Sequence, residues 1–214
     1  MSSRLPLQLT LALLKPDVTR VPPVLKAIQH KIIDEGFLVV QSKEMRLRQH
    51  QMEKFYEEHK GKFFYNRLVT FMASGPTHAL ILAHENAIKH WREVMGPTKV
   101  YRTKYEAPHT IRGRYGLTDT RNSTHGSDAE DTAAREMKFF FPEFCQEVWY
   151  KEQEPRFRRR MVVLDEDTFV HSLIQSRARG NHQEKKDPVQ GKARAGPGGG
   201  DNDSRLYAGK KVMG

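Results

Sequence analysis

The residues best suited to chemistry lie in the stretch Asn122-Ser123-Thr124-His125-Gly126-Ser127-Asp128. An imidazole becomes a nucleophile when one ring nitrogen is held by a hydrogen-bond acceptor, because the other nitrogen keeps its lone pair. Glu136 follows in what we expect to be a helix, close enough to fold back and accept that bond. The spacing from Ser127 to Glu130 is that of a capping box, so we expect this helix to begin at Ser127 with its positive end beside His125. The stretch therefore predicts a histidine that carries a phosphoryl group.

The composition limits the classes of protein that the chain can be. It has 214 residues and a formal net charge of +10, spread along the chain, which suits a ligand that bears phosphates, either nucleotide or nucleic acid. A single cysteine, Cys145, excludes an internal disulfide framework and a cysteine-rich zinc site. No apolar run approaches the roughly 20 residues of a membrane span. Ten histidines are present, so His125 alone is a weak signal. A functional role for it depends on the residues that accompany it.

Hydrophobic patterning predicts the elements that position these residues. Strands are expected at residues 7–14, 37–47, 77–83 and 122–125. Helices are expected at residues 22–36, 49–59, 63–72, 86–95 and 127–140. Lys15-Pro16-Asp17 is expected to be a turn, and residues 98–111, which lack a clear period, a loop. The order predicts an α+β fold, a ferredoxin-like βαββαβ sandwich whose four-stranded antiparallel sheet is covered by helices.

The domain organisation follows from changes in composition. Residues 1–6 form an N-terminal extension, and residues 7–145 form the domain. Residues 146–175 are a basic extension that can be ordered in part, with one turn or helix against the core. Residues 176–214, which contain Gly196-Pro197-Gly198-Gly199-Gly200, are expected to be a disordered tail.

Five motifs stand out along the chain, namely Leu14-Lys15-Pro16-Asp17, Phe63-Phe64, Ser74-Gly75-Pro76, Thr110-Ile111-Arg112-Gly113, and the stretch from Asn122 to Asp128. Their order is that found in nucleoside diphosphate kinases, and the chain resembles that family, most closely a divergent branch of it, over about residues 7–141. The resemblance implies a two-step reaction in which His125 takes the γ-phosphate of ATP or another nucleoside triphosphate and passes it to a nucleoside diphosphate. It also implies Mg²⁺ that arrives with the nucleotide phosphates, without metal ligands from the protein.

The resemblance also implies a role for each site residue. Ser127 and Glu136 would position the imidazole of His125, and Tyr56 would support it. The transferring and neighbouring phosphates would be held by Lys15, Arg92, Thr98 and Arg112. Asn122 would contact the sugar hydroxyl or the phosphates, and Phe63 would stack on the base without selecting among bases.

Each signal also has a simpler interpretation. Phe63 and Phe64 could both pack in the core, with at least one expected to do so, and Arg92 and Arg112 could be solvated surface cations. Residues 99–109 are longer than in the family pattern and Asp119 replaces a small apolar residue, so the nucleotide affinity and the family's oligomer are both in question. The 99–109 segment and the C-terminal extension could instead bind a second copy or a protein partner. The alternative function is an interaction protein that keeps the nucleotide site but needs a partner for activity; nucleic-acid binding is less favoured. The expected location is intracellular, in the mitochondrion or the cytoplasm.

Overall fold

The centre of the protein is a four-stranded antiparallel sheet with the strand order β2-β3-β1-β4. The computed structural model describes residues 5–174, so the tail expected at residues 176–214 lies outside the described residues. The strands are β1 (Gln8–Leu14), β2 (Leu38–Met45), β3 (Thr77–His84) and β4 (Thr124–Gly126). β1 pairs with β3 along its whole length and with β4 at its C-terminal end, where Leu13 lies opposite His125. The predicted α+β fold with a four-stranded antiparallel sheet is therefore confirmed.

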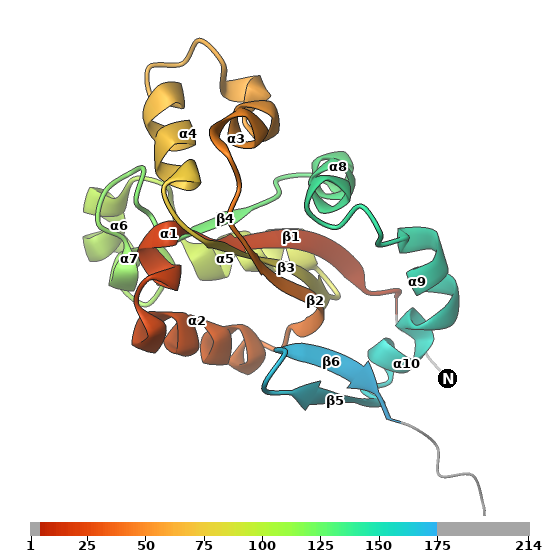
Figure 1. Cartoon of the computed structure of the whole chain (residues 1–214). Helices are drawn as coiled ribbons and strands as arrows, with labels where there is room; N and C mark the ends of the chain where they lie inside the picture. Colours follow the sequence, from red (N-terminus) through yellow and green to blue (C-terminus); the bar gives the residue numbers. More distant parts are fainter. Residues whose placement is uncertain (1–4, 175–214) are drawn as a thin grey trace, which may run out of the picture. The chain divides into compact units, whose positions relative to one another are not determined.

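Helices cover both faces of this sheet (Figure 1). One face carries α3 (Gln49–Phe55), α4 (Tyr65–Ala73), α8 (Glu130–Phe140), α9 (Gln146–Glu152) and α10 (Glu154–Arg158). The other face carries α1 (Pro16–Thr19), α2 (Pro22–Asp34), α5 (Ala87–Met95) and α7 (Ile111–Tyr115). A 3₁₀ turn (Glu57–His59) follows α3, and α6 (Val100–Glu106) precedes α7.

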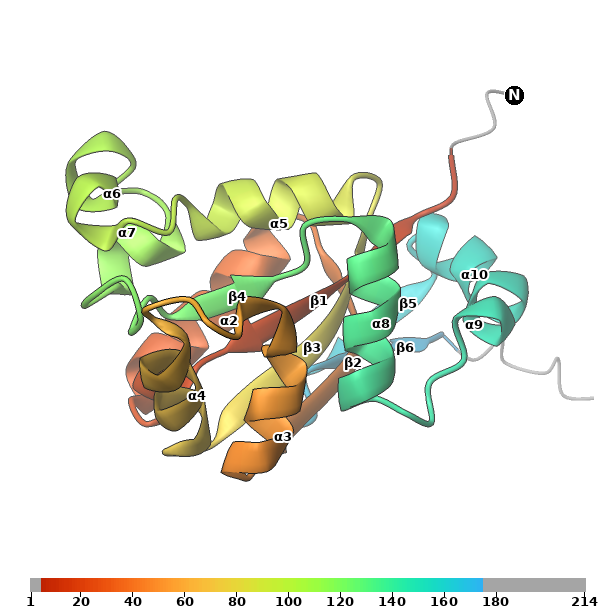
Figure 2. The same ribbon diagram turned by 90° about the horizontal axis from the view of Figure 1, so that it is seen from above.

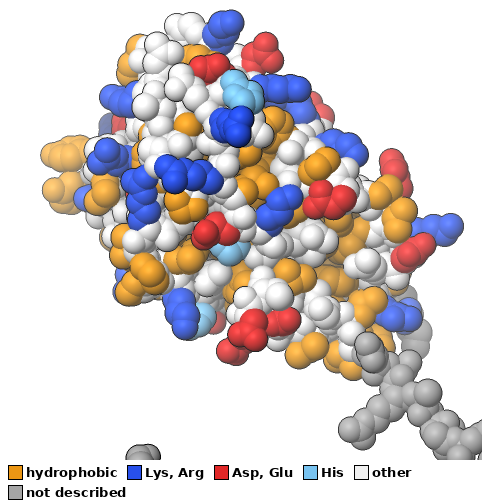
Figure 3. Space-filling view, in the orientation of Figure 1, with side chains coloured by type: hydrophobic (Ala, Val, Ile, Leu, Met, Phe, Trp, Pro, Cys, Tyr) orange, Lys and Arg blue, Asp and Glu red, His pale blue; other side chains and the backbone are white. Residues whose placement is uncertain are grey.

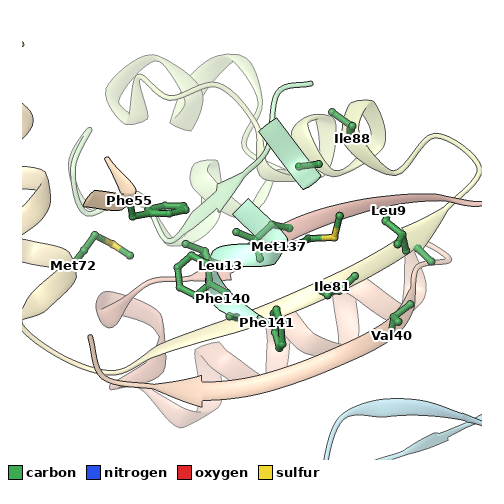
Figure 4. Close-up of a cluster of buried hydrophobic side chains, with 14 of the residues drawn as sticks. Leu9, Leu13, Val40, Phe55, Met72, Ile81, Ile88, Met137, Phe140 and Phe141 are labelled. Atoms are coloured by element: carbon green, nitrogen blue, oxygen red, sulfur yellow. The ribbon is translucent and has the colours of Figure 1, made fainter. Parts of the chain in front are cut away.

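β1 shows why the sheet needs cover on both sides. Leu9, Leu11 and Leu13 pack into the core beneath α3 and α8, whereas Ala12 and Leu14 pack into the core on the α2 and α5 side. Figure 4 shows the first of these cores, in which side chains from the strands meet those of α3 and α8. Because successive strand residues point to opposite faces, the nearly continuous apolar run of β1 can be buried only between two layers of helices.

Two local predictions are wrong. Residues 98–111 are not a loop, because they contain α6 and the start of α7. One tertiary and one local hydrogen bond stabilise α6. Its first amide, Val100 N, donates to Asp119 Oδ1 at 3.0 Å, and within the helix the Thr103 hydroxyl donates to Lys99 O at 2.8 Å. A helix of seven residues is too short to show a clear hydrophobic period. Likewise, residues 16–19 form the short helix α1 and not only a turn.

The predicted capping box at Ser127 is also wrong. α8 begins at Glu130, after the extended residue Ala129, which makes no side-chain capping bond. The Ser127 hydroxyl instead donates to Glu136 Oε2 at 2.6 Å. A hydrogen bond to a buried carboxylate is stronger than the bond that a capping serine accepts from a backbone amide at a solvated helix end. Ser127 therefore positions Glu136 and does not cap α8.

Residues after the expected domain boundary pack against the same cores. Trp149 of α9 and Phe157 of α10 are buried beneath the sheet face that α8 covers. The hairpin of β5 (Val162–Asp165) and β6 (Val170–Leu173) lies beside β2, where Val39 N donates to His171 Nδ1 at 2.9 Å. Phe169, in its turn, is buried in the second core. None of the helices within residues 5–174 is long and apolar enough to cross a membrane.

Candidate active site

A histidine and a buried carboxylate form the centre of the site. His125 lies on β4, and its Nε2 is 2.9 Å from Oε1 of Glu136 on α8. Because a carboxylate only accepts, we place the imidazole proton on Nε2. Burial alone would raise the pKa of Glu136, but the hydrogen bonds that it accepts from His125 and from the Ser127 hydroxyl lower it. Glu136 is therefore ionised, and Nδ1 of His125, which has no hydrogen-bond partner within residues 5–174, keeps its lone pair.

Packing holds the imidazole from its other sides. The rings of Phe55 and Tyr56 meet it edge to face, with centroids at 5.4 and 6.0 Å. Trp91 Nε1 donates to the backbone oxygen of His125 at 3.2 Å. Figure 2 shows β4 between α5, which carries Trp91, and α3, which carries Phe55. The sequence prediction missed Phe55 and Trp91, because an apolar residue at such a position of an amphipathic helix is typical of the core.

Gly126 explains how Trp91 comes so close to the site. A Cβ atom at residue 126 would lie 2.4 Å from Cδ1 of the Trp91 ring, a separation that real Cβ atoms do not show. Only glycine therefore allows the indole to lie against β4 and bind the His125 carbonyl. The glycine next to the histidine therefore serves this close approach of the indole.

A cavity of about 1370 Å³ opens in front of His125. Nine of the ten predicted site residues line it. They are Lys15, Tyr56, Phe63, Arg92, Thr98, Arg112, Asn122, His125 and Glu136. Ser127 does not line it, because it is buried behind Glu136. The structure thus brings together residues from all parts of the domain at the end of β4.

Lys15 supplies a buried amine to this cavity. Its Nζ lies 2.6 Å from Asn122 Oδ1 and 3.4 Å from the backbone oxygen of Thr120, and the residue is only 5% exposed. Burial first, and then the charge of Arg112, lower the pKa of Lys15 to about 7, against the opposing effect of Asp17. The free site therefore holds an amine whose charged form is disfavoured by burial and by Arg112, and a bound anion would favour that charged form.

Arg112 is a second cation, and hydrogen bonds to backbone oxygens hold it in place. Its Nη1 donates to Gly96 O at 2.8 Å, and its Nη2 donates to Thr124 O at 3.0 Å. Its Nε is buried and has no partner among the described residues. Burial, and then the charge of Arg92, lower the pKa of Arg112 to about 10. A phosphate in the cavity would relieve the repulsion between these cations.

Three other predicted residues are placed as follows. Thr98 Oγ1 lies 3.4 Å from Arg112 Nη1, so it belongs to the cationic group. Tyr56 is buried and its hydroxyl has no partner among the described residues, and burial raises its pKa. Phe63 is 89% exposed at the cavity rim, whereas Phe64 is partly buried and packs against the core. An exposed aromatic face at the rim of a cavity that also holds Lys15, Arg92 and Arg112 suits a planar ligand with phosphates.

Comparisons with known proteins agree with this geometry. The family model for nucleoside diphosphate kinase matches residues 8–145. Nucleoside diphosphate kinase 6 of Xenopus tropicalis is 54% identical over 168 residues, which cover 78% of this chain and 94% of that protein. The human nucleoside diphosphate kinase 6 is 51% identical over 165 residues, which cover 77% and 89%.

Solved structures share the fold. The nucleoside diphosphate kinase of Aquifex aeolicus matches with a TM-score of 0.61 and 36% identity, over 63% of this chain and 95% of that one. The enzyme of Halobacterium salinarum, solved in complex with CDP, matches with a TM-score of 0.58 and 31% identity, over 67% and 97%. The family resemblance inferred from the motifs is thus confirmed, and the chain belongs to the nucleoside diphosphate kinase family.

Proposed function

We propose that the protein is an active nucleoside diphosphate kinase that carries the γ-phosphate on His125. The observation that supports this most is the pair of bonds on Glu136, which binds Nε2 of His125 with one oxygen and Ser127 with the other. This arrangement leaves Nδ1 as the imidazole nitrogen with a free lone pair, next to a cavity whose lining includes Lys15, Arg92 and Arg112. A nucleophile with an oriented ring and a cationic surround is what phosphoryl transfer to histidine requires.

In the first step, Nδ1 of His125 attacks the γ-phosphorus of a nucleoside triphosphate. The new N–P bond forms as the bond to the bridging oxygen breaks, and the nucleoside diphosphate leaves with the electron pair. Nε2 keeps its proton, and the positive charge that develops on the ring is stabilised by the ionised Glu136. In the second step, a terminal oxygen of another nucleoside diphosphate attacks the same phosphorus and the N–P bond breaks, which restores the neutral imidazole.

The cations would align the phosphates and neutralise charge. Lys15 and Arg112 hold fixed positions in the cavity wall, whereas Arg92 is exposed and could follow the ligand. Charge in the transition state spreads over the equatorial oxygens, so several fixed cations stabilise it better than one. Asn122 lies against Lys15 and would contact the sugar or the phosphates from there.

Mg²⁺ would be held by the nucleotide and not by a protein cage. Within residues 5–174, no three His, Cys, Asp or Glu side chains lie together as a metal site. Lys15, Arg92 and Arg112 line the cavity, and Glu136 already has partners on both oxygens. Mg²⁺ bound to the phosphates would neutralise part of their charge while keeping most of its water ligands.

The base would be held chiefly by stacking. Phe63 offers an exposed ring at the rim, and a ring face attracts every nucleobase. The Halobacterium protein was solved with CDP, which supports a nucleoside diphosphate as the ligand of this cavity. We therefore expect ATP and other nucleoside di- and triphosphates to bind with little preference among bases.

Phosphate trapping tests the proposal. The full-length protein is mixed with γ-labelled ATP and Mg²⁺, and the label is then chased with GDP or UDP. We expect an acid-labile, base-stable label that either diphosphate discharges. His125→Ala should abolish it, whereas His59→Ala, which alters another histidine of the same cavity, should keep it. No label on folded wild-type protein, or equal label on His125→Ala, would refute the proposal.

A further inference from the structure

A second cavity, of about 930 Å³, lies between α4, α6 and the turn at residues 117–121. We name it the α4–α6 cavity. The proposed transfer reaction does not use it, although its volume is in the range of small-molecule sites. Figures 1 and 2 both place α4 and α6 at the same end of the sheet.

Three cations line the α4–α6 cavity, namely Arg67, Lys104 and Arg121. None of them forms an ion pair with a residue of the described part of the chain. Asp119, the acid of the lining, is already bound by Lys99 Nζ at 3.1 Å. Figure 3, which has the orientation of Figure 1, shows Lys and Arg side chains gathered on the part of the surface nearest α4. The cavity is therefore suited to an anion, and arginine pairs bind phosphate in particular.

Aromatic rings give the cavity a second chemical character. Tyr101 is 78% exposed and touches Tyr105 edge to face at 5.7 Å, so its ring is available for stacking. Phe71 forms a buried wall, with the Arg121 guanidinium 5.8 Å from its ring centroid. A free phosphate would use the cations but not the rings, and an apolar molecule would leave the cations unpaired. A ligand with both a planar base and phosphates uses both.

We propose that the α4–α6 cavity binds a second nucleoside phosphate, separate from the one in front of His125. Thr118 and Asn66 add a hydroxyl and an amide to the lining, which suit the hydroxyls of a ribose. The occupant is a mononucleotide, since the cavity has room for one drug-sized ligand.

The two cavities share a wall, which couples their ligands. Arg67, Asp119 and Thr120 line both. The backbone oxygen of Asp119 accepts from Asn122 Nδ2 at 3.0 Å, and that of Thr120 lies 3.4 Å from Lys15 Nζ. A ligand that shifts the turn at residues 117–121 therefore shifts the amide and the amine that face the catalytic cavity.

Binding stoichiometry tests the proposal without phosphoryl transfer. Equilibrium dialysis with labelled ADP uses full-length His125→Ala, so failure of the proposed reaction does not affect the result. We expect two ADP per chain in this parent protein. Adding Lys104→Gln and Arg121→Gln together should leave one ADP per chain. Arg102→Gln, on the same helix but outside the cavity and paired with Glu106, should keep two.

Stacking provides a second readout. Tyr101→Ala should weaken the second ADP about fivefold or more and leave the first unchanged. Thermal unfolding of each variant confirms that it is folded. One ADP per chain in the parent protein, or two in the Lys104→Gln/Arg121→Gln variant, would overturn the proposal. Displacement of the second ADP by a single-stranded oligonucleotide at a lower concentration than ADP itself requires would also overturn it, in favour of nucleic acid.

Discussion

Nucleotide binding should take up a proton on Lys15. In the free protein, burial and Arg112 lower the pKa of Lys15 to about 7, so at pH 8 about a tenth of the molecules carry the charge. A bound diphosphate supplies the missing anion and raises the pKa, because opposite charge favours the ammonium form. Binding of ADP should therefore take up about 0.9 protons on Lys15 at pH 8 and about 0.5 at pH 7. Above pH 7, the ADP affinity should fall by up to tenfold per pH unit.

Calorimetry measures this uptake directly. ADP is titrated into the protein at pH 8 in two buffers with different enthalpies of ionisation, and the difference in heat gives the number of protons bound. Lys15→Met removes the titrating group, and Lys15→Arg keeps the charge on a guanidinium that does not titrate at this pH. Both should lose the uptake. Equal uptake by wild type and by both variants would refute the assignment of the low pKa to Lys15.

The same pKa predicts how stability depends on pH. Lys15 has a pKa of 10.5 in the unfolded chain and about 7 in the folded protein, so between these values the unfolded chain binds more protons. Its contribution to the free energy of unfolding should therefore rise with pH, by about 2 kcal/mol from pH 7 to pH 9. Urea unfolding at the two pH values measures this rise. Lys15→Met should remove it and be the more stable protein at pH 7; a rise of equal size in that variant would contradict the reasoning.

Three further substitutions test the site and its support. Glu136→Gln removes the charge that stabilises the His125 imidazolium, so the rate of phosphohistidine formation should fall about a hundredfold or more in rapid-quench labelling. Gly126→Ala forces a Cβ against Trp91, so the free energy of unfolding in urea should fall by about 1–3 kcal/mol. Phe169→Ala empties a buried position in the C-terminal hairpin and should cost about 3–5 kcal/mol in the same assay.

Matched controls separate these effects from general damage. Glu58→Gln alters another carboxylate of the cavity and should leave the labelling rate within about twofold. The double variant Trp91→Phe/Gly126→Ala should lose less free energy of unfolding than the sum of the two single variants, because the smaller ring makes room for the new Cβ. Val163→Ala, at a 58% exposed position of the same hairpin, should stay within about 0.5 kcal/mol of wild type. The idea that residues 146–174 support the core fails if Phe169→Ala behaves like Val163→Ala.

The strands were predictable because their signal is local. The apolar run of β1 and the patterns of β2 and β3 reflect burial that repeats along a few neighbouring residues. α6 was missed because its stability comes from Asp119, nineteen residues downstream of its first amide. The β5–β6 hairpin had no clear pattern either, since its burial depends on β2, a strand far away in the chain.

For the candidate site, the sequence by itself determined the residue types and their order. They are a histidine, a serine and a glutamate that follow it, a set of cations and an aromatic ring. These are chemical identities, which need no coordinates. Tertiary structure decided which nitrogen of His125 is free, that Ser127 binds Glu136 and does not cap a helix, and that Trp91 holds the backbone of His125. It also decided the low pKa of Lys15. The reason is physical, because hydrogen-bond partners and desolvation depend on which distant segments meet in space, and a linear pattern of residues does not contain those distances.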